Sequence, residues 1–276
     1  MVNHTPDPDD SQFQHFSKKQ RIVAWISKTL FDKLVYRSRQ GLTKGLLRKG
    51  GLAFIPESLL APEETAETRF WKQLDLQDRV VYDVGAFHGL LTCFFAKQAR
   101  HVVAYEPTPP NYSRLAENVR LNEFRNVTLR KCGVSAAPGT LTMGWNPLTP
   151  GAACLIDSAS RRSPELRSES VPVVRLDQDQ IEQGLPYPDF IKIDVEGREL
   201  DVLRGMESIL VSATPPALFL EMHGETMNEK RRKTGAIVSY LRQLGYQNIQ
   251  HVESGLMVDE TNFAVAARGH LYCRVS

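Results

Sequence analysis

From about residue 79 onward, apolar segments of strand length alternate with segments that have helical periodicity. Strands that alternate with helices form a parallel sheet with helices on both of its faces. The alternation is interrupted between residues 136 and 170, where clusters of Pro, Gly and Ser predict a short β excursion with a mobile polar loop. YQNIQHV and NFAVAARG are predicted to complete the sheet as two strands, one of them antiparallel. The predicted strands of the alternating part are VVYDV, HVVAYEP, NVTLRKCGVS, PDFIKIDVEG and PALFLEMHG, and a further strand, VPVVRLD, is predicted at the end of the interruption.

The N-terminal part of the chain has a different character. Residues 1–16 are polar and are predicted to be a disordered tail. Residues 17–38 carry an apolar stripe of Ile22, Ile26, Leu30 and Leu34, which predicts an amphipathic helix within a basic N-terminal helical extension over residues 17–64. Residues 18–49 hold ten Lys and Arg and one acid. Two interpretations stay open: a helix that packs on the main domain, which the stripe favours, or peripheral contact with a membrane or another anionic surface.

Composition excludes several classes of protein. The chain has 276 residues, 42% of them hydrophobic and 24% charged, as in ordinary globular proteins. No apolar run approaches the roughly 18 residues that a membrane-spanning helix needs, and no secretory signal is expected. The four Cys are scattered without a CxxC pair, so free buried thiols and a cytoplasmic location are predicted.

The loop after the first strand of the alternating part, DVGAFHG, indicates what the sheet binds. Ligands of open parallel sheets bind beyond the carboxyl ends of the strands. Here the spacing is Gly85-x-x-x-Gly89, and Phe87 stands where a dinucleotide fingerprint needs a Gly. Asp83 would repel a diphosphate, so the loop favours a cationic ligand without phosphate, such as S-adenosylmethionine. Glu106 ends the second strand, where an acid can accept hydrogen bonds from ribose hydroxyls, although both acids could instead be helix caps or loop acids.

Five segments, in this order, resemble the FkbM family of S-adenosylmethionine-dependent methyltransferases. The resemblance covers roughly residues 65–267, and KIDVEG at residues 192–197 is its most specific part. It implies a Rossmann-like class I methyltransferase fold over residues 65–276, with a mostly parallel seven-stranded sheet, and usually O-methylation of a hydroxyl on a sugar or secondary metabolite. The segments are VVYDVGAFHG, VVAYEPTPPNYSRLAENVRLN, NVTLRKCGVS, FIKIDVEGRELDVLRG and FLEMHG.

The resemblance and the loop chemistry together predict a set of cofactor-binding residues. The chain departs from many relatives at Phe87-His88, where those relatives carry Asn-Ile. Gly133, Val134 and Ser135 offer an adenine ring only backbone and hydroxyl contacts. The predicted cofactor-binding residues are Asp83, Gly85, Ala86, Gly89, Glu106, Pro107, Gly133, Val134 and Asp194.

Residues at the ends of the fourth and fifth strands of the predicted sheet are the candidates for catalysis. Methyl transfer to an alcohol benefits from a base, and His223 is the leading candidate because its ordinary pKa lies near neutrality. Asp194 is predicted to position the cofactor or the acceptor. Glu196, Glu221 and His88 are predicted to bind substrate. A divalent metal held by the carboxylates and His223 is the alternative, and the expectation is that no metal is required.

Two other functions compete with a hydroxyl methyltransferase. The basic segment would suit a nucleic-acid methyltransferase. However, the fourth strand ends in DVEG rather than the Asn/Asp-Pro-Pro-Tyr/Phe run of enzymes that methylate amino groups of bases. A non-catalytic scaffold would have no use for the ligand acids Asp83 and Glu106. The expected partner is therefore a small-molecule or glycan acceptor and not a nucleic acid, with a pocket built from residues 136–170 and the N-terminal segment.

Overall fold

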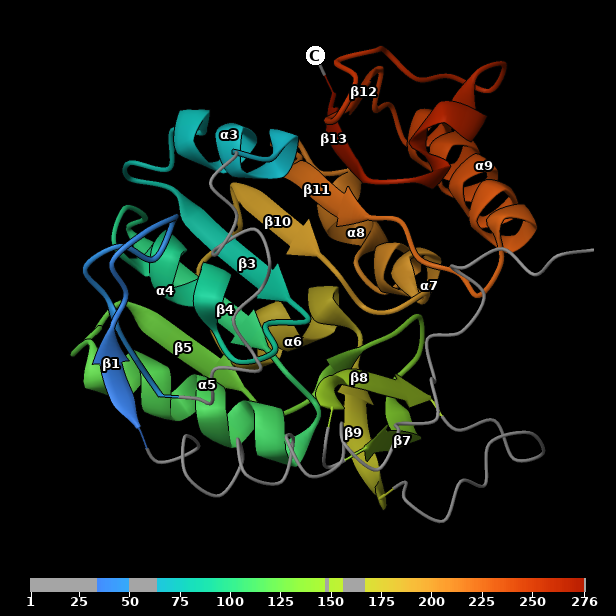
Figure 1. Cartoon of the computed structure of the whole chain (residues 1–276). Coiled ribbons are helices and arrows are strands. Elements are labelled where there is room, and N and C mark those ends of the chain that lie inside the picture. The colour runs from blue at the N-terminus through green and yellow to red at the C-terminus, as the bar shows by residue number, and fades with distance from the viewer. Residues whose placement is uncertain (1–33, 50–63, 147–148, 156–166, 276) are drawn as a thin grey trace, which may run out of the picture.

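A seven-stranded sheet is the centre of the computed structural model, which describes residues 34–49, 64–146, 149–155 and 167–275 (Figure 1). The strand order is β12-β13-β11-β10-β3-β4-β5, and β13 runs antiparallel to both of its neighbours. The pairs among β11, β10, β3, β4 and β5 are parallel. This arrangement confirms the predicted mostly parallel seven-stranded sheet. The bounds are β3 (Val80–Val84), β4 (His101–Tyr105), β5 (Val127–Arg130), β10 (Phe190–Ile193), β11 (Ala217–Glu221), β12 (Asn248–His251) and β13 (His270–Arg274).

Helices cover both faces of this sheet, and the strands alternate their side chains between the two layers (Figure 1). In β3, Tyr82 packs in the cluster that includes residues of α6, α7, α8 and α9, whereas Val81 packs against Trp71 of α3 and Phe95 of α4. Asp83 therefore faces the same layer as Val81. The helices are α3 (Ala66–Gln73), α4 (Leu90–Ala96), α5 (Pro109–Leu121), α6 (Leu176–Glu182), α7 (Glu199–Arg204), α8 (Glu207–Leu210) and α9 (Met227–Gln243).

The predicted β excursion is a second, four-stranded sheet with the order β6-β9-β7-β8. β9 is parallel to β6 and antiparallel to β7. The polar loop that was predicted to be mobile falls largely on residues 156–166, which lie outside the described residues. The strands are β6 (Gly133–Val134), β7 (Gly139–Asn146), β8 (Thr149–Leu155) and β9 (Arg167–Val174).

The described part of the N-terminal extension is a small hairpin of β1 (Val35–Arg37) and β2 (Leu47–Lys49). It packs on α5, where Asn122 Oδ1 accepts the Leu47 N–H at 2.8 Å and Asn118 Oδ1 accepts the Lys49 N–H at 2.8 Å. The predicted helix over residues 17–38 is wrong at residues 35–37, because these residues form strand β1, which pairs with β2. The remainder of that helix up to residue 33, the tail over residues 1–16 and the segment 50–63 lie outside the described residues.

Two local predictions need correction near the C-terminal end of the sheet. The segment NFAVAARG is not a strand: Phe263–Ala267 form the 3₁₀ helix η3, which packs against α9. The antiparallel strand is His270–Arg274 instead, with Leu271 and Cys273 buried at alternate positions. Helix α3 had no counterpart in the sequence prediction; the Thr65 side chain caps it by accepting the Thr68 N–H.

The prediction of free buried thiols holds for the cysteines whose side chains are described. Cys93, Cys132 and Cys273 are buried and unpaired by disulfides. Within the described ranges, no helix has both the length and the apolar character needed to cross a bilayer.

Candidate active site

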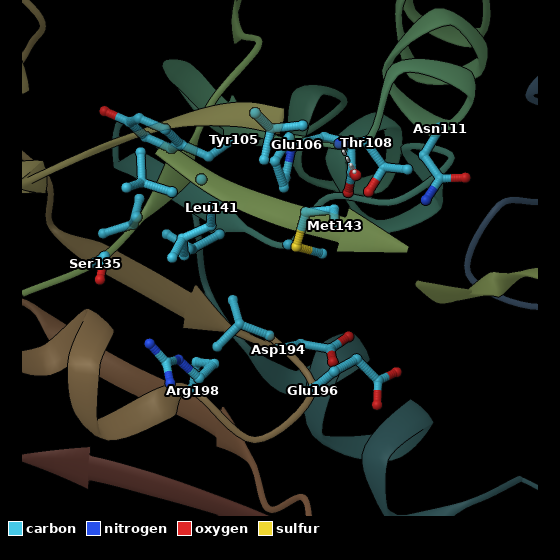
Figure 2. Close-up of a pocket in the computed structure, with 18 of the residues that line it drawn as sticks. Tyr105, Glu106, Thr108, Asn111, Ser135, Leu141, Met143, Asp194, Glu196 and Arg198 are labelled. Carbon is cyan, nitrogen blue, oxygen red and sulfur yellow. Dashed lines mark hydrogen bonds between the residues drawn. The ribbon is translucent and has the colours of Figure 1, made fainter. Parts of the chain in front are cut away.

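A cavity of about 1040 Å³, open solvent included, lies beyond the carboxyl ends of β3, β4 and β10 and beside the second sheet. Figure 2 shows Glu106, Thr108 and Asn111 on one side of it and Asp194, Glu196 and Arg198 on the other. Its lining is Val84, Gly85, Phe87, Tyr105, Glu106, Pro107, Thr108, Asn111, Gly133, Val134, Ser135, Leu141, Met143, Val171, Val173, Asp194, Val195, Glu196 and Arg198.

The Gly85 loop lies very close to the loop that follows β10. Gly85 has φ of 81°, and a Cβ built on it would lie 1.8 Å from the Asp194 carbonyl oxygen, so no side chain fits there. The N–H groups of Gly85 and Ala86 both donate to the Tyr105 carbonyl at 3.0 Å. Phe87 and Glu196 also have positive φ, 50° and 53°. Strained backbone of this kind concentrates at ligand-binding sites, because the surrounding structure must hold it in place.

Glu106 is held by the backbone at the end of β4. Its Oε2 accepts the Phe87 N–H at 2.9 Å, and its Oε1 accepts the Thr108 N–H at 2.8 Å. Burial raises the pKa of Glu106 to about 7, and these hydrogen bonds oppose that shift. The carboxyl group is therefore fixed in orientation, lines the cavity and retains acceptor capacity for a ligand.

Asp83, by contrast, is fully buried and does not line the cavity. Its Oδ2 accepts the Thr92 hydroxyl at 2.5 Å, and its Oδ1 lies 3.2 Å from Lys192 Nζ. Lys192 is the cross-strand neighbour of Asp83 in β10. Its Nζ also lies 3.2 Å from Asp194 Oδ2 and donates a hydrogen bond to the Gly85 carbonyl at 2.8 Å. Burial opposes the charge of Lys192, but Asp194 and Asp83 raise its pKa. Asp83 thus acts on the Gly85 loop through Lys192 rather than by touching a ligand in the cavity.

The second sheet supplies an apolar wall of the cavity. Leu141 and Met143 lie two residues apart in β7, and Val171 and Val173 lie two residues apart in β9, so each pair shares one face of its strand. This wall agrees with the expectation that residues 136–170 contribute to the pocket, although the sequence analysis named none of these four residues. Their period-two spacing was the available signal. Thr108, Asn111 and Arg198 also line the cavity and were not among the predicted site residues.

Three predicted site residues lie in the Gly85 loop but away from the lining. Ala86 is buried among the side chains that pack between α4 and α5. Gly89, with φ of 78°, begins α4 as its N-cap. The His88 ring stacks on the Phe87 ring with centroids 3.7 Å apart, and its pKa is lowered to about 3, chiefly by burial. None of these three residues lines the cavity, and substrate binding by His88 stays a prediction.

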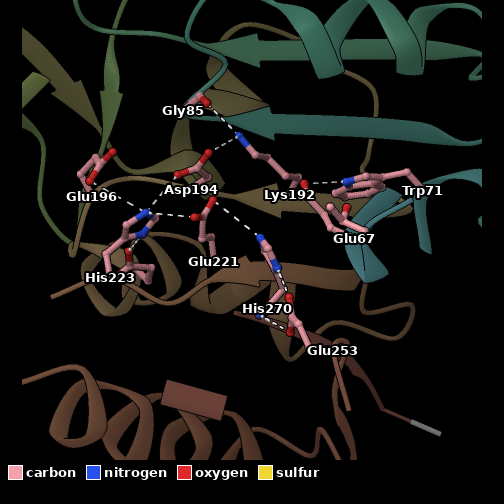
Figure 3. A network of polar contacts seen from close by, with 12 residues as sticks. Glu67, Trp71, Gly85, Lys192, Asp194, Glu196, Glu221, His223, Glu253 and His270 are labelled. Carbon is pink, nitrogen blue, oxygen red and sulfur yellow. Dashed lines mark hydrogen bonds and ion pairs between the residues drawn. The ribbon is translucent and has the colours of Figure 1, made fainter. Parts of the chain in front are cut away.

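A charged network connects the ends of β10 and β11 (Figure 3). His223 lies at its centre: Nδ1 is 3.0 Å from Glu199 Oε1, and Nε2 is 3.7 Å from Asp194 Oδ1, 3.8 Å from Glu196 Oε2 and 3.5 Å from Glu221 Oε1. The predicted catalytic and substrate residues at these two strand ends therefore come together in one cluster. Asp194 and Glu196 belong both to this cluster and to the cavity lining.

The carboxylates around His223 alter its protonation. Burial favours the neutral ring, but hydrogen bonds to Glu199 and Glu221 and the charges of Glu196 and Asp194 raise the pKa of His223 to about 11. Burial raises the pKa of Glu196 to about 7, and the charge of His223 opposes this shift. The carboxylates around the ring thus favour the charged form of His223 at neutral pH. This differs from the expected base that ionises near neutrality, because the sequence did not reveal how many carboxylates surround the ring.

Known proteins resemble this chain over the region that contains the cavity. It is 30% identical over 156 residues to methyltransferase sdnD of Sordaria araneosa, covering 46% of this chain and 60% of the relative. It is 30% identical over 149 residues to hexuronic acid methyltransferase AglP of Haloferax volcanii, covering 53% and 57%. The chain thus spans somewhat less than two thirds of the length of these curated relatives.

The solved structures that resemble the chain include methyltransferase FkbM from Methylobacillus flagellatus KT, with 19% identity, a TM-score of 0.47, and coverage of 74% of this chain and 45% of that one. The sequence model of the methyltransferase FkbM domain family matches residues 83–247. This match covers more than half of the chain and runs from Asp83 past the end of α9. The chain therefore belongs to the FkbM methyltransferase family.

Proposed function

We propose that the protein is an S-adenosylmethionine-dependent methyltransferase that methylates a hydroxyl group on a sugar or a small secondary metabolite. One observation carries the proposal: a single cavity is lined both by the Gly85 loop with Glu106 and by Asp194 and Glu196 of the His223 cluster. A methyl donor and an acceptor could thus lie side by side in the same cavity. Family membership supports S-adenosylmethionine as the cofactor.

The chain's own residues fit that cofactor. Gly85 lines the cavity without a side chain, so a ligand can lie against its backbone, and Glu106 offers a fixed carboxyl group to ribose hydroxyls. Pro107, Gly133 and Val134 line the cavity beside it and can pack on an adenine ring. When bound, S-adenosylmethionine would supply a methyl group from its sulfonium, which becomes a neutral thioether. Asp194, at the other side of the cavity, can meet the positive end of the cofactor.

The acceptor is assigned to the side of the cavity that holds Asp194 and Glu196. Their carboxylates can accept a hydrogen bond from a hydroxyl and so fix the direction of its oxygen. Orientation of this kind accounts for much of the acceleration that is available to a displacement at carbon. His223 lies behind them, within 4 Å of both, and holds their positions through charge.

The name of AglP states that it methylates a hexuronic acid, and this supports a saccharide acceptor for the present chain. Arg198 adds a cation to the cavity lining, where it pairs with Asp201 at 2.8 Å and remains about half exposed. An acidic sugar would present both a hydroxyl for the carboxylate side and a carboxylate for Arg198. Hexuronic acids are therefore the first acceptors to test.

The test uses methyl-labelled S-adenosylmethionine with four acceptor pools: hexuronic acid saccharides, neutral saccharides, hydroxylated aromatic or polyketide-like metabolites, and RNA or DNA. We expect label in a saccharide or metabolite pool, recovered as a methyl ether, and none in nucleic acid. Glu106→Ala protein is the matched control, because it should lose label without losing its fold. Label in nucleic acid would replace the proposal by the competing methyltransferase function. Failure to bind S-adenosylmethionine at all would favour the scaffold.

A further inference from the structure

We infer that Asp194, Glu196 and His223 form a binding site for a divalent cation of the Mg²⁺ and Mn²⁺ class at the edge of the cavity. The site itself rests on geometry alone, and its role in catalysis rests on the proposed function. It reverses the sequence-based expectation that no metal is required, because that expectation could not include the distances among these side chains.

The ligand atoms are grouped as a cation requires. Asp194, Glu196 and His223 each offer one atom, and these atoms all lie within 4.8 Å of one another. His223 Nε2 is 3.7 Å from Asp194 Oδ1 and 3.8 Å from Glu196 Oε2. Metal–oxygen bonds of about 2.0–2.2 Å place neighbouring ligand atoms of an octahedron about 3 Å apart and opposite ones about 4.2 Å apart. The two separations from His223 Nε2 fall between these values, so a contraction of the group around an ion would bring the three ligand atoms to bonding distance.

A second layer of residues fixes the histidine for this task. Glu199, only 1% exposed, accepts a hydrogen bond from His223 Nδ1 at 3.0 Å and a second from the Gly197 N–H at 2.8 Å. A carboxylate on Nδ1 is the usual partner of a metal-bound histidine, because it places the proton on that nitrogen and leaves the Nε2 lone pair for the metal. An ion that binds at Nε2 would displace the proton from this nitrogen, which lies 3.7 Å from Asp194 Oδ1 and 3.8 Å from Glu196 Oε2.

Glu221 belongs to the same supporting layer on the opposite side. Its Oε1 is 3.5 Å from His223 Nε2, and its Oε2 is 3.7 Å from His270 Nε2. The other ring nitrogen of His270, Nδ1, is 2.6 Å from Glu253 Oε1. Glu221 and His270 are cross-strand neighbours in β11 and β13 (Figure 3). The strands of the sheet, rather than a flexible loop, thus hold this side of the cluster.

The balance of charge also favours a further cation. Five carboxylates surround Lys192 and His223, namely Asp83, Asp194, Glu196, Glu199 and Glu221. Even with both basic side chains charged, negative charge remains in excess in a partly buried region, and His270 at the edge offsets only part of it. Carboxylates at such short range repel one another, and a bound divalent ion would relieve that repulsion.

Because Asp194 and Glu196 line the cavity, an ion held between them and His223 would be accessible to an acceptor. It would lower the pKa of a hydroxyl that contacts it, so the proton leaves to solvent water. The oxygen then forms a bond to the methyl carbon while the carbon–sulfur bond breaks and its electron pair stays on sulfur.

The test is direct metal binding, without any acceptor. The full chain is treated with EDTA, dialysed and titrated with Mn²⁺, while electron paramagnetic resonance follows the free ion. We expect one saturable Mn²⁺ site per chain, competed by Mg²⁺. Glu199→Gln should weaken Mn²⁺ binding about 10–100-fold, the usual effect of removing the partner of a metal-bound histidine. Glu196→Gln and His223→Gln should abolish it.

Glu260→Gln is the matched control, because it removes an exposed carboxylate that pairs with Arg242 away from the cluster. It should bind Mn²⁺ as the unchanged protein does. Circular dichroism and the melting temperature check that each variant folds, and Glu196→Gln, at a side chain 41% exposed, carries the least risk. Absence of saturable Mn²⁺ binding, or equal binding in Glu196→Gln and Glu260→Gln, would overturn the inference. Calorimetry with S-adenosylhomocysteine on the same samples tests the proposed function separately.

Discussion

The two sides of the cavity are built by opposite means. On the cofactor side, Glu106 is held by two backbone N–H groups that lie within 19 residues of it along the chain. On the acceptor side, Asp194, Glu196 and His223 contact other charged side chains from β10, β11 and α7. Every substitution except that by proline keeps a backbone donor, whereas most substitutions of a side-chain partner remove it. We therefore expect the cofactor side to be robust and the acceptor side to be sensitive to single changes in its surroundings.

The largest effect is expected where the two sides meet. Gly85→Ala would place a methyl group against the Asp194 carbonyl, 1.8 Å away, in addition to the cost of a positive φ. We expect the free energy of unfolding to fall by more than about 4 kcal/mol, which only severe steric or packing defects reach. Urea denaturation measures the free energy of unfolding of the variant and of the unchanged protein. Gly245→Ala is the control: its φ is 95° but nothing lies within 4 Å of its Cβ, so the loss should be about 1–2 kcal/mol. Equal losses at the two glycines would contradict the close approach.

The next effect concerns Lys192, which connects the two sides. Lys192→Met would leave Asp83 and Asp194 without their shared cation in a buried place, at an expected loss of about 3–5 kcal/mol of stability. Adding Asp83→Asn should recover part of that loss, because it removes one of the stranded charges. Thermal unfolding of the single and double variants checks this. If the double variant is no more stable than the single one, the repulsion between the two carboxylates is not the cause.

A smaller effect is expected within the cofactor side alone. Glu106→Ala should weaken S-adenosylhomocysteine binding by about 1–3 kcal/mol, through the loss of hydrogen bonds to a charged group. Mn²⁺ binding should not change, since Glu106 takes no part in the His223 cluster. Calorimetry with both ligands decides the matter, and Glu182→Gln, at an exposed position in α6, is the control. A parallel loss of both ligands would mean that the two sides are not separable.

The smallest effect follows from the pKa of Glu106, which is raised to about 7 by burial. Because this pKa is higher in the folded protein than in the unfolded chain, the folded protein without ligand keeps Glu106 protonated up to about pH 7. The free energy of unfolding therefore falls as pH rises from about 4.5 to about 7. Only the carboxylate can accept hydrogen bonds from both ribose hydroxyls. Cofactor affinity should therefore rise about tenfold from about pH 6 to about pH 8. Glu106→Gln should remove this dependence, and a slope unchanged in that variant would assign it to another group.

The same contrast explains which parts of the structure the sequence could predict. Strands such as VVYDV are buried on both faces, so their composition alone identifies them. The Gly85 loop and Glu106 come directly after two such strands, so their places in the fold could be predicted as well. The 3₁₀ helix at Phe263–Ala267 was mistaken for a strand because both can bury small apolar residues, and only its packing on α9 decides between them. The partner of Asp83 could not be predicted, because Lys192 lies 109 residues away and is brought there by strand pairing. Protonation of His223 likewise depends on acids from β11 and from the loop and helix after β10.

The β excursion has a consequence for how this scaffold can change over time. It leaves the main domain at β6 and returns at β9, and these two strands pair side by side, with Gly133 opposite Val173. The segment between them is thus anchored at one place, and lengthening or replacing a loop that is closed at its base costs little. Yet its strands provide Leu141, Met143 and Val171 to the cavity wall. New acceptor preferences could therefore arise by exchange of this one segment, as an interchangeable module, while the machinery that binds the methyl donor stays the same.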